Sequence, residues 1–174
     1  MTTIVRYSTV ALLLTATVTA VVFNTVVRGW EAWVAGPVVS WVTAGGTEVN
    51  PEMAIVYFGV GTPDPQGLLV TPECTFVLLF APLVLLAGVV LLSDRLPLTR
   101  TLAGLATGGL VLVAINEIRF GLIGWATQRF GPTGYAWTHS LVGSLLSLVG
   151  MALAFGIFLL ILRRARNTTR RTET

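Results

Sequence analysis

Residues 140–162, SLVGSLLSLVGMALAFGIFLLIL, form a run without a single charged side chain, and the arginines of a basic tail follow directly. At about 1.5 Å of helical rise per residue, this run is long enough to cross roughly 30 Å of hydrocarbon. Three further apolar runs precede it, at residues 8–27, 75–92 and 102–118. The sequence therefore predicts an all-α integral membrane protein with four transmembrane helices in one membrane domain, residues 1–174.

The composition of the chain supports this class. Of the 174 residues, 54% are hydrophobic and 11% are charged, whereas an ordinary soluble domain has roughly 25% charged residues. This composition excludes disorder and argues against a water-soluble globule. One cysteine and one histidine exclude a disulfide framework, a thiolate zinc cluster and a histidine-rich metal site, so no cofactor is predicted.

The basic residues are concentrated in the tail, residues 163–174, which holds five of the eleven arginines. A basic cluster beside an apolar run is typical of an anchor on anionic lipid. We therefore expect the lipid bilayer, and not a nucleic acid, to be the partner of this tail.

The first apolar run has a competing interpretation as a secretory signal. Arg6 precedes it, and residues 18–20 resemble a cleavage site. The apolar run continues past that site through Val27, which favours a retained span.

The arginines also predict the orientation. With four spans, eight of them fall on one side and three (Arg28, Arg119 and Arg129) on the other. The positive-inside rule then places both termini and the short connection at residues 93–100 in the cytoplasm. The acidic segment at residues 28–73 is predicted to face outward.

Within the outer segment, two structures are expected. Trp30, Trp33 and Trp41 lie near one helical face, which predicts an interfacial helix, interrupted at Gly36 and Pro37. Farther on, residues 55–58 and 68–70 are β-prone and flank the turn-forming residues Pro63 to Gly67, which predicts a small β-hairpin outside the membrane.

The only cysteine follows this hairpin. Thr71 has the character of an N-cap, Pro72 suits the first helical position, and Cys74 is then expected in the first turn of the second span. Unpaired backbone N–H groups and the helix dipole favour a thiolate there. The alternative is a buried apolar cysteine that only packs.

Asn116 and Arg119 are three residues apart near the outer end of the third span, so the asparagine amide is expected to brace the guanidinium. An arginine at this level can also be a snorkelling anchor. His139 opens the fourth span. The predicted topology brings Cys74, Arg119 and His139 to the same outer boundary, and an ionisable residue at membrane depth indicates function.

These residues, in this order, resemble the exosortase and archaeosortase family of integral-membrane cysteine transpeptidases. The resemblance rests on Cys74, on the Asn-Glu-Ile-Arg run at residues 116–119, on the His-Ser-Leu-Val-Gly run at residues 139–143, and on the hairpin-like run before the cysteine. It covers residues 55–143, in a compact form of the family. Thr75 and Phe76 follow the cysteine where the family usually has small residues, and many members have additional N-terminal spans.

The resemblance implies a thiol peptidase or transpeptidase that acts through a thioester. Cys74 would be the nucleophile, His139 the proton shuttle and Arg119 the oxyanion stabiliser, with Asn116 supporting Arg119. The implied substrates are membrane-tethered proteins whose C-terminal tail has a short motif, an apolar helix and a basic end. The implied location is a prokaryotic plasma membrane, with the active site on the extracytoplasmic side.

Two alternatives stay open from the sequence. One is a non-enzymatic four-helix assembly or channel subunit, in which Cys74 packs and Arg119 anchors. The other is hydrolysis without transfer, since both reactions share the acyl-enzyme. Gly104, Gly108 and Gly109 in the third span suit close helix packing in every case.

Overall fold

The computed structural model describes residues 2–93 and 96–172, which are mostly helical with a small three-stranded sheet. Asp94 and Arg95 of the predicted connection, and Glu173 and Thr174 of the predicted tail, lie outside the described residues. The chain divides into two compact units. The first unit contains Met1–Val22, Val77–Leu112 and Gly150–Thr174, and the second contains Phe23–Phe76 and Val113–Val149.

Four long helices carry the predicted spans. They are α1 (Thr2–Val22), α3 (Phe76–Leu92), α4 (Leu98–Trp137) and α5 (Gly143–Thr172). Among the described residues, two helical stretches are long and apolar enough to cross a membrane, Thr3–Val22 and Leu98–Arg164, the second of which joins α4 and α5. Phe76–Leu92 is apolar but shorter.

The first predicted span, residues 8–27, is not one continuous helix. The helix α1 ends at Val22, and α2 (Asn24–Val42) begins after Phe23, whose backbone is not helical (φ −90°, ψ 34°). The apolar run through Val27 therefore belongs to two helices. Hydropathy does not record this break, because no proline or charged residue marks it.

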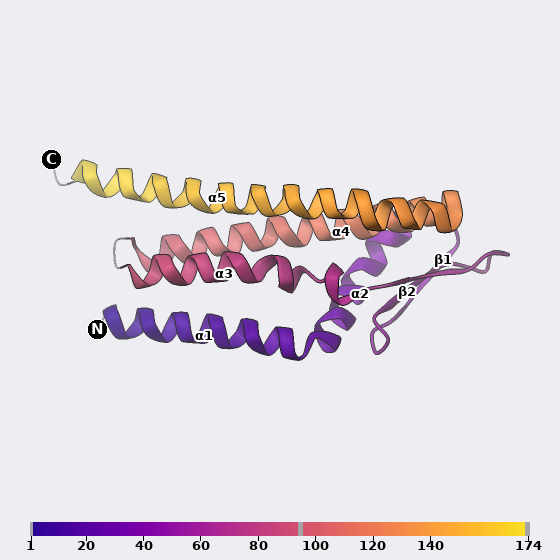
Figure 1. The fold of residues 1–174 in the computed structure, drawn as a ribbon, viewed down its shortest axis with the longest axis horizontal. Coiled ribbons are helices and arrows are strands. Elements are labelled where there is room, and N and C mark those ends of the chain that lie inside the picture. The colour runs from indigo at the N-terminus through magenta and orange to yellow at the C-terminus, as the bar shows by residue number, and fades with distance from the viewer. Residues whose placement is uncertain (1, 94–95, 173–174) are drawn as a thin grey trace. The chain divides into compact units, whose positions relative to one another are not determined.

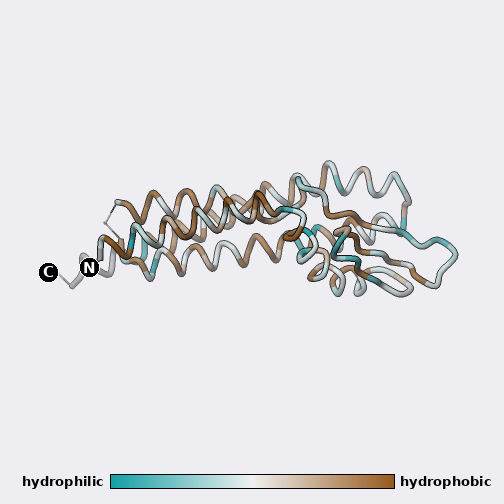
Figure 2. Tube along the Cα trace, turned by 90° about the horizontal axis from the view of Figure 1, so that it is seen from below, coloured by the Kyte–Doolittle hydropathy of each residue, from teal (hydrophilic) through white to brown (hydrophobic). Residues whose placement is uncertain are grey.

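In the first unit, α1, α3 and the adjoining parts of α4 and α5 lie side by side (Figure 1), and hydrophobic residues predominate along them (Figure 2). The predicted role of the glycines in close packing is confirmed. A Cβ on Gly104 would lie 2.9 Å from the ring of Phe158, and a Cβ on Gly108 would lie 2.7 Å from Leu83. Small residues thus let the helices approach closely.

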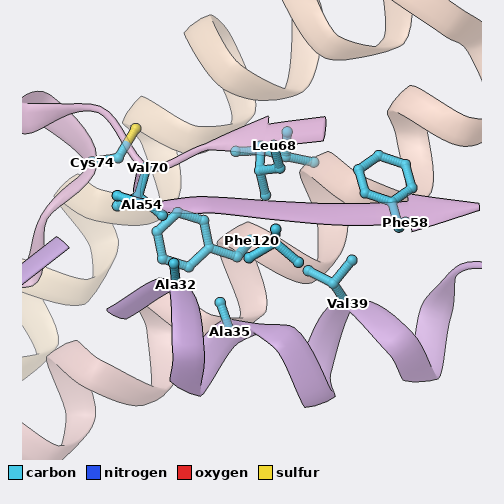
Figure 3. Packing of buried hydrophobic residues seen from close by; sticks show 11 residues of the cluster. Ala32, Ala35, Val39, Ala54, Phe58, Leu68, Val70, Cys74 and Phe120 are labelled. Carbon is cyan, nitrogen blue, oxygen red and sulfur yellow. The ribbon is translucent and has the colours of Figure 1, made fainter. Parts of the chain in front are cut away.

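The second unit contains an antiparallel sheet in the order β1 (Gly46–Asn50), β2 (Ile55–Val60) and β3 (Gln66–Leu69). The predicted hairpin of β2 and β3 is confirmed, whereas β1 was not predicted. Buried side chains join α2, the sheet and α4 into one core (Figure 3): Ala32, Ala35, Val39, Val56, Phe58, Leu68, Val70, Phe120 and Ile123. Truncating a buried phenylalanine in such a core costs about 3–5 kcal/mol.

The helix α2 packs on this sheet and continues without a break through Gly36 and Pro37, so the predicted interruption was wrong. Gly36 serves close packing instead, because a Cβ there would lie 2.6 Å from a methyl group of Val49 on β1. The indole rings of Trp30 and Trp33 are exposed on the other side of the helix.

The helix α4 contains a sharp break at Gly131, with φ 60° and ψ −146°. This conformation favours glycine. The chain reverses there, and the second leg continues through a π-helix, Thr138–Val142, into α5 (Figure 1). Residues 113–130 and 132–149 consequently form an antiparallel helical pair within the second unit.

Candidate functional site

Cys74 ends a short 3₁₀-helix, Pro72–Cys74, for which Thr71 and Pro72 occupy the predicted N-cap and first positions. Cys74 was predicted in the first turn of the second span, and this placement was wrong. Because Thr75 is extended and α3 begins at Phe76, Cys74 lies just before the long helix. Thr71 makes no capping hydrogen bond with its side chain. Its hydroxyl instead donates to Sγ of Cys74 at 3.2 Å.

The structure brings together the three residues that the sequence singled out. Nη2 of Arg119 donates to Sγ of Cys74 at 3.2 Å, and Nδ1 of His139 lies 3.8 Å from the same sulfur. Cys74 is 1% exposed and lies at one end of the buried cluster, opposite Phe58 (Figure 3). A thiol, an imidazole and a guanidinium therefore converge at one buried point, and all three belong to the second unit.

The guanidinium of Arg119 also has a second partner besides Cys74. Its Nη1 donates to Oγ of Ser147 at 3.4 Å, and this hydroxyl donates to the carbonyl oxygen of Gly143 at 2.9 Å. Gly143 provides the space, since a Cβ there would lie 2.6 Å from Nε of Arg119. Arg119 is only 6% exposed. Water therefore screens its positive charge little, and the charge acts strongly on the neighbouring sulfur of Cys74.

The predicted brace from Asn116 is not formed. Oδ1 of Asn116 and Nε of Arg119 are both buried, and neither has a hydrogen-bond partner among the described residues. Asn116 instead lines a cavity of about 120 Å³ together with Glu31 and Glu117. The spacing of three residues places Asn116 and Arg119 one turn apart on the helix, but their side chains do not form the predicted hydrogen bond.

His139 lies in the π-helix, a local widening that is frequent at functional sites. Its ring stacks on that of Tyr135, with centroids 5.1 Å apart and planes inclined by 11°. The exposed carboxylate of Glu73 is nearby. A hydrogen bond from its own backbone N–H holds the pKa of Glu73 below the ordinary value, and the charge of His139 acts in the same direction.

Several contacts of the site were not predicted from the sequence. Tyr135, His139, Gly143 and Ser147 recur every four residues, and this spacing was the signal that could have identified Tyr135 and Ser147. Glu31 was also missed. It accepts hydrogen bonds from the hydroxyl of Thr75 and the backbone N–H of Phe76, directly after Cys74.

The donors and acceptors at this point suit acyl transfer. A sulfur nucleophile, an imidazole that can carry a proton and a cation next to the reacting atom are the groups that thioester chemistry requires. Among residues 2–93 and 96–172, no three histidine, cysteine or acidic side chains gather where they could hold a metal ion. In comparisons with models of protein families, with curated proteins and with solved structures, the chain matches none.

Proposed function

We propose that this protein is a membrane thiol peptidase or transpeptidase of the exosortase and archaeosortase type. The single observation that carries the proposal is the convergence of Arg119 and His139 on the sulfur of the only cysteine. A cysteine that only packs needs apolar neighbours. This sulfur, at the edge of a hydrophobic cluster, has a cation, a hydroxyl and an imidazole around it.

In the proposed reaction, His139 takes the proton of the Cys74 thiol, and the sulfur attacks a peptide carbonyl carbon. Arg119 stabilises the oxygen of the tetrahedral centre, which forms one bond away from the sulfur that it contacts. The C–N bond then breaks, and His139 returns the proton to the leaving amine. An acceptor amine or a water molecule then attacks the thioester carbon and gives a proton to His139. The C–S bond breaks, and His139 returns that proton to the leaving sulfur, which restores the thiol.

The proposed substrate is the C-terminal tail of a membrane-tethered protein, with a short motif followed by an apolar helix and a basic end. We place the site at the outer face of a prokaryotic plasma membrane that α1, α3, α4 and α5 cross. Arginine asymmetry and the apolar helices support this topology.

The test is mass spectrometry of Cys74 after co-expression with such a tail. An acyl adduct on Cys74 is expected, and a hydroxylamine-labile bond identifies it as a thioester. Cys74→Ala is the control, in which both the adduct and the processed tail should be lost. Normal processing by the alanine variant would exclude the thiol mechanism and favour the non-enzymatic alternative.

A further inference from the structure

The helix α2 holds the chain on both sides of the cysteine. Nη1 of Arg28 donates to the carbonyl oxygen of Val70 at 3.0 Å, four residues before Cys74. The carboxylate of Glu31 accepts hydrogen bonds from Oγ1 of Thr75 and from the backbone N of Phe76, at 3.1 Å for the latter. Two residues one helical turn apart therefore fix the segment that presents the sulfur.

Glu31 also contacts the N-terminal end of α3. Thr75 occupies the N-cap position with extended backbone (φ −73°, ψ 137°), and its hydroxyl donates to Glu31. The first N–H groups of a helix have no partner within the helix, and Glu31 satisfies that of Phe76. A carboxylate is also electrostatically favourable at the positive end of a helix.

Burying the carboxyl group of Glu31 costs free energy. Glu31 is 6% exposed, Thr75 is 0% exposed, and Oε2 of Glu31 has no partner among the described residues. Burial raises the pKa of Glu31 to about 7, although Thr75, Phe76 and Arg28 all act against that rise. Glu117, on α4, lines the same cavity. A glutamine would fill this position without the cost of burying a charge.

We propose that Glu31 is a positioning residue, which keeps the sulfur of Cys74 beside Arg119 and His139 by binding the two residues that follow it. The proposal rests on the function proposed for Cys74 and adds a residue to it. The carboxylate binds Thr75 and Phe76 more strongly than a neutral carboxyl or amide does, because hydrogen bonds to a charged acceptor are stronger. The hold on the cysteine is consequently tighter when Glu31 is ionised.

The experiment measures the single-turnover acylation of Cys74 in the full-length protein in detergent, with a short peptidyl thioester as the probe. This probe needs no sorting motif, and the protein has no other cysteine. Glu31→Leu removes the acceptor at similar volume and should slow acylation by up to ~100-fold, the effect of a misplacement of about 1 Å.

Glu31→Gln keeps an acceptor oxygen and should recover most of the rate. The ratio of the wild-type rate to the glutamine rate should exceed one at pH 8 and fall toward one at pH 6, where most of the wild-type Glu31 is protonated. A purely structural role would leave that ratio constant with pH. Glu48→Gln, a carboxyl change on an exposed residue of β1 in the same unit, should stay within about threefold of wild type at pH 8.

Equal rates for folded Glu31→Leu and wild type would overturn the positioning role. If the leucine variant does not fold, a pH-independent ratio for Glu31→Gln overturns it. Absence of acylation in the wild type would instead reject Cys74 as a nucleophile, and with it both proposals. Acylation that depends on Glu31 without any processing of tails would retain the positioning role and reject the peptidase.

Discussion

The guanidinium group of Arg119 makes two contacts, one of them with the sulfur of Cys74, and a lysine ammonium group would not make both at once. Nη2 of Arg119 reaches Sγ, while Nη1 reaches Ser147. The planar fork of arginine holds both nitrogens at a fixed separation, whereas the lysine ammonium is a single point charge on a flexible stem. Charge and geometry can therefore be separated by one substitution.

We expect Arg119→Lys to slow acyl transfer by ~100- to 1000-fold, as when one oxyanion donor is removed, with unchanged expression. The matched control is Arg129→Lys, since Arg129 is exposed on the same helix and should tolerate the change. Rates are measured on purified protein with a tail peptide. A rate for Arg119→Lys within a few-fold of wild type would make Arg119 an anchor.

The raised pKa of Glu31 predicts that the stability of the protein depends on pH. The unfolded carboxyl ionises near 4.5, whereas the folded one stays protonated up to about 7. The unfolded state therefore binds fewer protons between these values, and the free energy of unfolding falls as pH rises through this window. At 1.36 kcal/mol per pH unit, the loss is on the order of 3 kcal/mol.

Glu31→Gln should remove this dependence, so the variant should melt at a higher temperature than wild type at pH 8 and at a similar temperature at pH 4.5. Thermal unfolding in detergent at the two pH values provides the measurement. A glutamine variant that is less stable than wild type at pH 8 would show that the ionised form is stabilising.

At the scale of an element, the helix that starts after Gly131 aligns Tyr135, His139, Gly143 and Ser147 along one side, from a ring that stacks on the imidazole to a hydroxyl that holds Arg119. Gly143 is the member without a side chain. Its Cα faces Arg119 so closely that a methyl group would meet Nε at 2.6 Å and Cζ at 3.3 Å. The glycine of the His-x-x-x-Gly run thus makes room for the guanidinium.

Gly143→Ala should accordingly push the guanidinium away from the sulfur and lower the acylation rate by about 10- to 100-fold. Stability should fall as well, because the new methyl group would also lie 2.9 Å from the backbone carbonyl oxygen of Thr138, and the helix preference of alanine, roughly 0.5–1 kcal/mol, offsets only part of that crowding. Gly156→Ala is the control on α5, where a Cβ meets nothing within 4 Å. Equal rates for both variants and wild type would mean that Arg119 accommodates the methyl group without loss.

The sequence carried information about elements unevenly. Apolar runs predicted α3 almost to the residue, and turn chemistry at Pro63 to Gly67 predicted the β2–β3 hairpin. Cys74, Arg119 and His139 could be singled out from the sequence, because the predicted helix ends and the arginine count place all three at the outer membrane boundary. By contrast, the break at Phe23 has no compositional mark, and the contact between Glu31 and Phe76 joins residues 45 positions apart, which no local pattern encodes.

For the whole molecule, the charge pattern and the contacts of α1 agree on one point. Nη1 of Arg6 donates to the carbonyl oxygen of Leu91 at 3.2 Å, and Nη2 donates to that of Leu96 at 2.8 Å. The start of α1 and the connection after α3 consequently lie at the same end of the first unit. The positive-inside rule requires this, since it counts Arg6 and Arg100 on the same side.

The predicted topology can be tested without relying on the buried sulfur of Cys74. In a Cys74→Ala background, Asp64→Cys places a thiol in the exposed turn before β3, and Thr99→Cys places one in the exposed first turn of α4. If residues 28–73 face outward, a membrane-impermeant maleimide should label Asp64→Cys in intact cells and Thr99→Cys only after lysis. The reverse pattern would place the candidate site in the cytoplasm, where a tail processed at the outer face could not reach it. Labelling of both variants in intact cells would show that residues 76–98 do not cross the membrane, and the four-span topology would fail at α3.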